Sequence, residues 1–235
     1  MGILQRCVVC LLVLILMLLI EIMYHLSSFS FYFITKLKIT LKKFTCVDLG
    51  TYCGYSSLVL ATTLCQFLQD QKEDDGASSP FDFHIYTTEV STKLINVAQS
   101  IFRLANMEAY ITPIFMKSED AANKLSSPSA TVLSSTLREH GVTNIDFLLL
   151  DHDKSRYLSD LQDLEQSQLL RAGSYVSADN VVFNRLDAYR DHMRTLALEG
   201  VVESRLEEMN LEYSNNLKDG LEMTKYLKDP PISEN

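Results

Sequence analysis

The chain has 235 residues, 47% of them hydrophobic, which is enough for one α/β domain with a short appendage. Its formal net charge is −9, from 30 acidic and 21 basic residues. Binding to nucleic acid without sequence preference depends on Lys and Arg neutralising phosphates, so we expect no nucleic-acid partner. The five cysteines are odd in number and irregularly spaced, which does not indicate a disulfide framework.

The N-terminal segment is strongly apolar. Every residue from 7 to 20 is apolar, and with Ile3 and Leu4 the run approaches the roughly 20 residues that cross a bilayer as a helix. Aromatic residues and then lysines follow, which is typical of a cytoplasmic interface. These are Phe29, Phe31, Tyr32, Phe33, Lys36, Lys38, Lys42 and Lys43. We predict a single-pass membrane anchor over 1–43, with the remaining chain in the cytosol.

A cleaved signal peptide is the alternative for this segment. The apolar core of a signal peptide is similarly short. No A-x-A-like cleavage site follows, although Ser27 and Ser28 are small. Both interpretations stay open from the residues alone.

From residue 44 onward, short apolar segments alternate with helical patterns. We expect a domain over 44–228 and a frayed tail over 229–235. The alternation predicts an α/β fold with a doubly wound, mostly parallel sheet. The expected strands are 46–50, 83–89, 109–116 and 144–151, and 173–183 is expected to be a strand that runs into a loop. The expected helices are 56–68 and 92–106. Two polar or Ser-rich segments, 69–82 and 125–135, are expected to be loops.

A glycine-bearing turn follows the first expected strand. The segment DLGTYCGYS (48–56) ends a strand and opens a helix, which is where open α/β sheets bind ligands. Gly50 and Gly54 lack a Cβ, so a ligand can lie against the backbone there. Their spacing is not the G-x-G-x-x-G of dinucleotide enzymes, and glycines at strand ends are often only turn formers.

Glu89 ends the second expected strand. An acidic residue at that place can accept hydrogen bonds from ribose hydroxyls, although a solvated acid is the plain alternative. Together with the glycine turn, Glu89 indicates a nucleoside ligand. These two features do not separate nicotinamide from S-adenosylmethionine.

Polar side chains follow the last two expected strands. Asp151 and Lys154 come directly after the buried run 144–150, and Asp179 and Asn180 follow the strand after that. Adjacent parallel strands would bring them to one edge, where two carboxylates and an amide oxygen form a site suited to Mg²⁺. Lys154 would lie beside the metal, which disfavours its protonated form and suits a base. The alternative is that these residues are strand-end turns and caps.

These segments resemble catechol O-methyltransferase. DLGTYCGYS, the Glu89 strand end, DHDKSRYL (151–158), ADNV (178–181) and LEYSNNLKDGLE (211–222) occur in the order of that family's signature segments. The resemblance runs from about residue 46 to about residue 227. It implies the seven-stranded Rossmann-like fold of class I methyltransferases, with helices on both faces and an antiparallel last strand.

The resemblance also implies roles for single residues. The S-adenosylmethionine site would be lined by Asp48, Gly50, Tyr52, Ser56, Glu89, Ser118, Asp151 and His152, with Glu89 on the ribose and Ser118 on the adenine side. Asp151, Asp179 and Asn180 would be the Mg²⁺ ligands. Lys154 would be the general base, and Glu212 the acid that holds the second hydroxyl of a catechol. The implied activity is Mg²⁺-dependent methyl transfer from S-adenosylmethionine to a hydroxyl of a catechol-type substrate.

The sequence departs from the family at two places. Only about 20 residues, 25–44, separate the expected anchor from the first strand, where the family has helices that include a cofactor-covering segment. Asp153 stands where the family usually has Trp, and the chain contains no Trp. Three interpretations follow: an active enzyme with an altered acceptor pocket, a membrane-anchored S-adenosylmethionine-binding protein without turnover, or a chain whose N-terminal part is incomplete or wrongly joined. The oligomeric state is not predicted.

Overall fold

The computed structural model describes residues 43–75, 82–116, 131–210 and 217–232. The chain divides into two compact units. The larger contains residues 42–57 and 82–235, and the described part of the smaller is residues 58–75.

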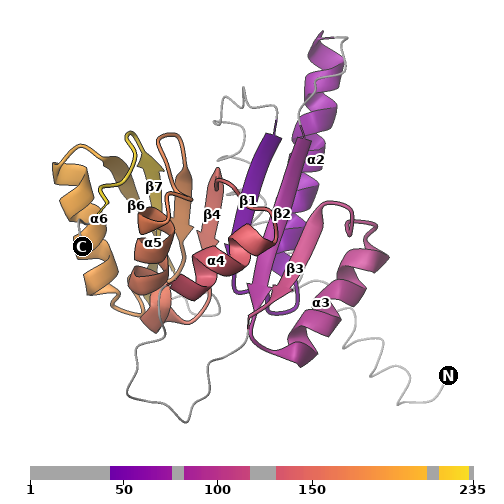
Figure 1. The fold of residues 1–235 in the computed structure, drawn as a ribbon, viewed down its shortest axis with the longest axis horizontal. Coiled ribbons are helices and arrows are strands. Elements are labelled where there is room, and N and C mark those ends of the chain that lie inside the picture. Colours follow the sequence, from indigo (N-terminus) through magenta and orange to yellow (C-terminus); the bar gives the residue numbers. More distant parts are fainter. Residues whose placement is uncertain (1–42, 76–81, 117–130, 211–216, 233–235) are drawn as a thin grey trace. The chain divides into compact units, whose positions relative to one another are not determined.

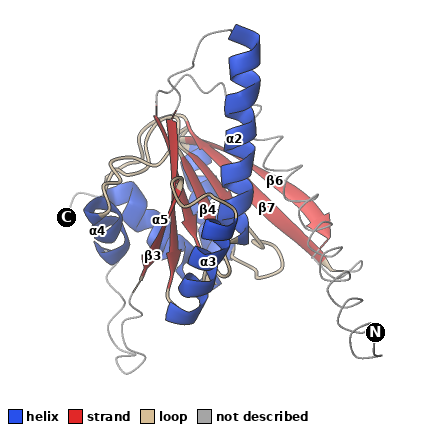
Figure 2. Cartoon of the chain, turned by 90° about the vertical axis from the view of Figure 1, so that its right-hand side faces the viewer, coloured by secondary structure: helices blue, strands red, loops and turns tan. Residues whose placement is uncertain are grey.

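A seven-stranded sheet forms the larger unit (Figures 1 and 2). Its strands are β1 (Lys43–Leu49), β2 (Asp82–Glu89), β3 (Ile111–Phe115), β4 (Phe147–Leu150), β5 (Tyr175–Ala178), β6 (Val202–Asn210) and β7 (Lys218–Tyr226). Their order is β3-β2-β1-β4-β5-β7-β6. The pairs among β1–β5 are parallel, and β7 is antiparallel to both of its neighbours. The predicted mostly parallel sheet with an antiparallel last strand is therefore confirmed.

Helices lie on both faces of this sheet. They are α3 (Thr92–Leu104), α4 (Thr131–Glu139), α5 (Tyr157–Gln166) and α6 (Asp187–Leu198), and the short 3₁₀ helix η1 (Lys154–Arg156) precedes α5. Buried side chains of α4, α5 and α6 join one apolar cluster with the strands. Figure 2 shows α3 on the other side of the sheet from α4 and α5, and α3 contacts β2 and β3.

The central strands are apolar because both of their faces are covered. Val47 in β1, Leu148 in β4 and Val176 in β5 are each 0% exposed. Parallel strands in this situation carry continuous apolar runs rather than alternating ones. The run FLLL in β4 is the clearest case. Its parallel pairing with β5 ends both strands at the same level, so the polar residues that follow them are neighbours.

Helix α2 (Tyr55–Asp75) begins at the turn after β1 and is longer than expected. The prediction of a loop over 69–82 was wrong for 69–75, which continue the helix. Four of the seven residues, Gln69, Gln71, Lys72 and Glu73, are good helix formers, so polarity alone did not indicate a loop. Within α2, Val59, Leu60, Ala61 and Leu64 are buried.

The loop predicted over 125–135 was also wrong in part, because α4 begins at Thr131. Leu133 and Leu137 are four residues apart and both buried, which is the spacing of one helix face. Asp163 of α5 supplies a carboxylate to Ser134, whose backbone N–H and hydroxyl donate to it at 2.8 and 2.9 Å. These long-range bonds stabilise the start of a helix in a Ser-rich segment whose composition is typical of a loop.

The predicted membrane anchor, 1–43, lies outside the described residues apart from Lys43. Within the part of the chain that the structure describes, no helix is long and apolar enough to span a bilayer.

Candidate active site

The carboxyl ends of the central strands meet at one edge of the sheet. Leu49 pairs with Leu150, and Leu150 pairs with Ala178. The ladder extends by one further bond on each side, because the Asp151 N–H donates to the Leu49 carbonyl and the Asp179 N–H donates to the Leu150 carbonyl, both at 3.0 Å. The residues that follow β1, β4 and β5 are therefore side by side, as predicted.

Gly50 allows the turn after β1 to approach the end of β4. Its φ is +110°, and a Cβ there would lie 2.5 Å from the Asp151 carbonyl oxygen and 2.9 Å from the His152 nitrogen. Gly54, at φ +90°, likewise allows Phe102 of α3 to approach, because an added Cβ would lie 2.6 Å from the Phe102 ring. Close approach of protein segments thus accounts for both glycines.

Asp48 is fully buried under this turn. One carboxylate oxygen, Oδ2, accepts bonds from the hydroxyls of Ser56 (2.8 Å), Ser57 (2.5 Å) and Thr87 (3.2 Å). The other, Oδ1, has no hydrogen-bond partner among the described residues. Burial raises the pKa of Asp48 to about 6, against the opposing effect of the serine hydroxyls. A buried acceptor without a partner is costly, and it marks a place where a ligand donor or water would bind.

Glu89 is 9% exposed, and its carboxylate accepts hydrogen bonds from the loops after β1 and β2. Its Oε2 accepts the Tyr52 N–H at 2.9 Å, and its Oε1 accepts the N–H groups of Val90 (2.9 Å) and Ser91 (2.8 Å). A carboxylate offers about four acceptor positions, so one stays open for a hydroxyl donor. Tyr52 itself has φ +48° and is 66% exposed, beside Glu89.

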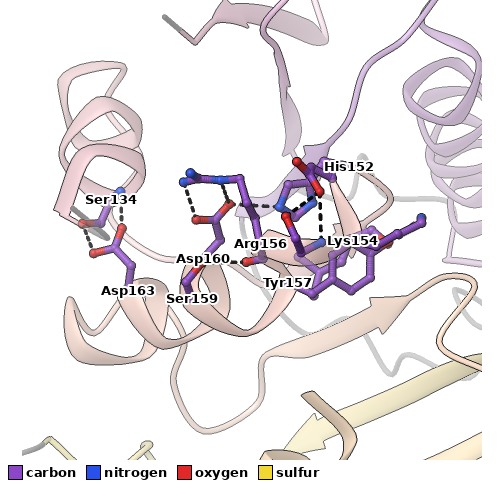
Figure 3. A network of polar contacts seen from close by, with 11 residues as sticks. Ser134, His152, Lys154, Arg156, Tyr157, Ser159, Asp160 and Asp163 are labelled. Atoms are coloured by element: carbon purple, nitrogen blue, oxygen red, sulfur yellow. Dashed lines mark hydrogen bonds and ion pairs between the residues drawn. The ribbon is translucent and has the colours of Figure 1, made fainter. Parts of the chain in front are cut away.

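Asp151 and Lys154 form an ion pair at the end of β4, and Figure 3 shows Lys154 beside Tyr157. The Lys154 ammonium lies 2.8 Å from Asp151 Oδ1 and 2.7 Å from the Tyr157 hydroxyl. That hydroxyl donates to the Leu150 carbonyl at 2.6 Å, and Tyr157 is 1% exposed. Burial raises the pKa of Tyr157, so the phenol stays protonated. Tyr157 thus holds the Lys154 nitrogen at the edge of the sheet.

His152 is held by α5. Its Nε2 lies 2.9 Å from Asp160 Oδ2, and its ring stacks on Tyr157 with centroids 5.1 Å apart. Arg156 also binds Asp160, with two contacts of 2.8 and 3.1 Å (Figure 3). Burial alone would raise the pKa of Asp160, but the bonds from His152 and Arg156 lower it. An ionised Asp160 accepts a proton-bearing Nε2, which leaves His152 Nδ1 buried and without a partner among the described residues.

Asp179 and Asn180 follow β5. Asp179 Oδ1 accepts the Asn180 N–H at 2.8 Å, and Asn180 has φ +57°, which asparagine tolerates better than most residues. Burial, followed by the charge of Asp151, raises the pKa of Asp179 to about 6. The Asn180 amide nitrogen donates to Asp219 Oδ2 at 2.7 Å. The structure therefore brings Asp151, Lys154, Asp179 and Asn180 together, as the sequence predicted.

Two predicted residues cannot be compared with the structure. Ser118 and Glu212 lie outside the described residues. Within the described residues, no group of three His, Cys, Asp or Glu side chains is arranged to hold a metal ion. Only two of the predicted Mg²⁺ ligands, Asp151 and Asp179, are of these residue types. The third is the amide of Asn180, so the predicted set is not a group of this kind.

Sequence reasoning missed four residues that support this edge. Ser57 and Thr87 hold Asp48, Tyr157 holds Lys154, and Asp219 holds Asn180. Tyr157 and Asp219 stand inside the segments DHDKSRYL and LEYSNNLKDGLE, but a linear pattern does not show which hydroxyl or carboxylate contacts which partner. Asp219 lies 39 residues after Asn180 in the chain.

The sheet order and the antiparallel β7 define a Rossmann-like methyltransferase fold. An O-methyltransferase from Bacillus cereus, solved in complex with SAH, matches with a TM-score of 0.52 and 21% identity over 77% of this chain and 73% of that chain. This likeness concerns the fold alone. No family model matches the sequence.

Curated relatives narrow the class. The chain is 28% identical to a Transmembrane O-methyltransferase homolog of Mus musculus over 180 residues, which are 77% of this chain and 59% of that protein. It is 28% identical to a Catechol O-methyltransferase of Sus scrofa over 180 residues, which are 77% and 81% of the two chains. The predicted resemblance is confirmed: the chain is a homologue of the catechol and transmembrane O-methyltransferases. It spans less than two thirds of the mouse transmembrane relative.

Proposed function

We propose that this protein transfers a methyl group from S-adenosylmethionine to a hydroxyl of a catechol-type substrate, with Mg²⁺ held by Asp151, Asp179 and Asn180. The observation that carries the proposal is a shared location. These three residues and Lys154 lie at the carboxyl-terminal edge of the sheet, where Asp48 and Glu89 also lie. The homology to O-methyltransferases supports the reaction class.

The loops after β1 and β2 are suited to the methyl donor. Glu89 keeps one acceptor position open for a ribose hydroxyl, and it lies beside Tyr52. Asp48 Oδ1 and His152 Nδ1 are buried polar atoms without partners among the described residues, so a ligand or the waters that accompany it would supply their hydrogen bonds. S-adenosylmethionine supplies the activated methyl group, and these residues bind and orient it.

The donor set after β4 and β5 fits a hard cation. Two carboxylates and an amide oxygen are ligands that Mg²⁺ accepts, with its other positions left for water or substrate oxygens. The raised pKa of Asp179 reflects burial and repulsion from Asp151, which a cation would offset. When bound, Mg²⁺ would supply Lewis acidity that lowers the pKa of a coordinated hydroxyl.

Lys154 is the residue that would remove the hydroxyl proton, after its ammonium has lost to solvent the proton that pairs it with Asp151 in this structure. A cation held by Asp151 would favour that loss. The Lys154 nitrogen is fixed by Asp151 and Tyr157, at 2.8 and 2.7 Å, so it is held in one place rather than swinging freely. A base fixed within hydrogen-bond reach of the reacting group contributes typically about 10²–10⁴-fold to a rate. The deprotonated oxygen would then attack the methyl carbon in line, so that the O–C bond forms as the S–C bond breaks and S-adenosylhomocysteine leaves. Correct orientation of the two reactants would favour this step.

Asp153 also has a structural role, as the cap of η1. Its Oδ1 accepts the Ser155 N–H at 3.0 Å and the Ser155 hydroxyl at 2.7 Å, which caps η1. These bonds lower the pKa of Asp153, so it is charged at neutral pH. A charged residue beside the acceptor favours a more polar catechol than an aromatic residue there would.

Membrane attachment through 1–43 is part of the proposal. Relatives bear the name transmembrane O-methyltransferase, which supports it. The apolar run over 7–20 is the corresponding feature of this chain. Carbonate extraction of membranes tests it: an anchored protein stays in the pellet, and release into the supernatant would count against a spanning helix.

The test of the reaction replaces Lys154 by Met, which keeps the length of the side chain but removes its nitrogen. We expect kcat for methyl transfer to a simple catechol to fall by about 10²–10⁴-fold, with little change in the affinity for S-adenosylhomocysteine. Lys93→Met, at an exposed position in the first turn of α3, is the control and should keep wild-type activity. A Lys154→Met protein with the wild-type kcat would refute the role of the base.

A further inference from the structure

Asp219 is the second residue of β7, and its carboxylate contacts Asn180 of the proposed metal site. It is 2% exposed, and its carboxylate accepts hydrogen bonds from the loop after β5 and from its own neighbour. Its Oδ1 accepts the N–H groups of Phe183 (3.0 Å) and Gly220 (2.8 Å). Those two bonds fix the carboxylate and leave Oδ2 for Asn180.

The pairing of Asp219 with Asn180 determines which atom of the amide is free. Asp219 Oδ2 lies 2.7 Å from Asn180 Nδ2. An ionised carboxylate only accepts hydrogen bonds, so the NH₂ group of the amide must face it. The amide oxygen then points the other way, and among the described residues it accepts no hydrogen bond.

We infer that Asp219 is a positioning residue for the metal site, because it turns the Asn180 carbonyl oxygen toward the cation. This rests on the proposed function, in which Asn180 is a Mg²⁺ ligand. A metal cannot bind an amide through its NH₂ group, so the orientation of this amide decides whether the third ligand exists. Asn180 has φ +57°, a left-handed conformation that asparagine adopts more readily than most residues.

Replacing Asp219 by Asn reverses the pairing. The introduced amide oxygen keeps the N–H groups of Phe183 and Gly220, so the introduced NH₂ group faces Asn180. Two NH₂ groups cannot pair, and the Asn180 amide must flip, which turns its own NH₂ group toward the metal. We expect Mg²⁺ affinity to fall by about 10–100-fold, the usual effect of losing such a supporting partner.

A second substitution should restore the site. With Asn180→Asp added to Asp219→Asn, the new carboxylate accepts the NH₂ group of the amide at position 219 through one oxygen and offers the other to Mg²⁺. We expect the double variant to bind Mg²⁺ within a few-fold of the wild type. A role of Asp219 in folding alone predicts no such rescue.

The measurement is calorimetric titration of the full chain, in detergent micelles, with Mg²⁺ alone, together with urea unfolding in metal-free buffer. The control is Asp146→Asn at the other end of β4. Asp146 is likewise buried and accepts a backbone N–H (Thr45, 2.8 Å) and an asparagine amide (Asn144, 3.1 Å). This variant should lose stability but keep its Mg²⁺ affinity.

Each outcome decides the inference. Weak binding in Asp219→Asn with rescue in the double variant supports it, as does a single variant that unfolds while the double variant folds and binds. Wild-type affinity in Asp219→Asn, or a folded double variant that does not bind, overturns it and leaves the proposed function standing. A wild-type protein that binds no Mg²⁺ overturns the metal part of the proposed function and this inference together.

Discussion

Asp48 combines full burial with an incomplete set of hydrogen bonds. Three hydroxyl groups donate to Oδ2, and Oδ1 has no partner within the described residues. Burial therefore raises the pKa of Asp48 from 3.8 to about 6. Such a residue costs stability in its charged form, which is a common property of ligand-binding positions.

The raised pKa of Asp48 predicts how stability depends on pH. Between about pH 4 and 6 the folded state binds more protons at Asp48 than the unfolded state, so this contribution to stability falls as pH rises. The loss is complete above about pH 6 and amounts to roughly 3 kcal/mol, from a shift of about two pKa units. In Asp48→Asn this component disappears, because an amide does not titrate.

Urea unfolding of wild type and Asp48→Asn at about pH 5 and about pH 7.5 measures the difference. The free energy of unfolding of the variant relative to the wild type should rise between the lower and the higher pH. Other groups titrate equally in both proteins, so the difference isolates Asp48. Parallel pH curves for the two proteins would show that the pKa of Asp48 is not raised.

At the scale of elements, the turn between β1 and α2 depends on the close approach of β4. In Gly50→Ala the Cβ would lie 2.5 Å from the Asp151 carbonyl oxygen and 2.7 Å from its carbon, and these backbone atoms cannot move aside easily. The substitution also places a non-glycine residue at φ +110°. We expect it to cost several kcal/mol, on the order of the largest single-substitution effects.

Gly141→Ala separates strain from crowding. Gly141 also has positive φ, +86°, but an added Cβ there meets nothing within 4 Å. This variant should lose only about 1–2 kcal/mol, the cost of the backbone conformation. Chemical denaturation of both variants checks the prediction. Equal losses would mean that the approach of β4 to Gly50 is not tight.

The sequence predicted elements best where one local pattern dominates. Strand β4 was found because its apolar run FLLL is followed by polar residues, and β1 because its apolar residues lead into a glycine turn. The end of α2 was not found, because polar helix formers resemble loop residues. Helices α4, α5 and α6 and strands β6 and β7 were not located either. Helix α4 begins in a Ser-rich stretch beside a carboxylate of α5 that is 29 residues away in the chain.

For the whole molecule, the edge of the sheet was predictable but its supporting bonds were not. Parallel pairing of β1, β4 and β5 places whatever follows them together, so Asp151, Asp179 and Asn180 could be grouped from sequence alone. Which atoms they present depends on residues brought near by folding, such as Asp219 and Tyr157. Ser118 and Glu212 stay predictions, since both lie outside the described residues.

The central claim is that the edge of the sheet carries metal-assisted methyl transfer. The most direct test is the transfer of a labelled methyl group from S-adenosylmethionine to a simple catechol by the full chain, with Mg²⁺ and with a chelator. We predict transfer with Mg²⁺, loss of transfer with the chelator, and loss with Mg²⁺ in Asp151→Ala. Transfer that continues in the chelator, or none in Mg²⁺ by a folded protein that binds S-adenosylhomocysteine, would contradict the account.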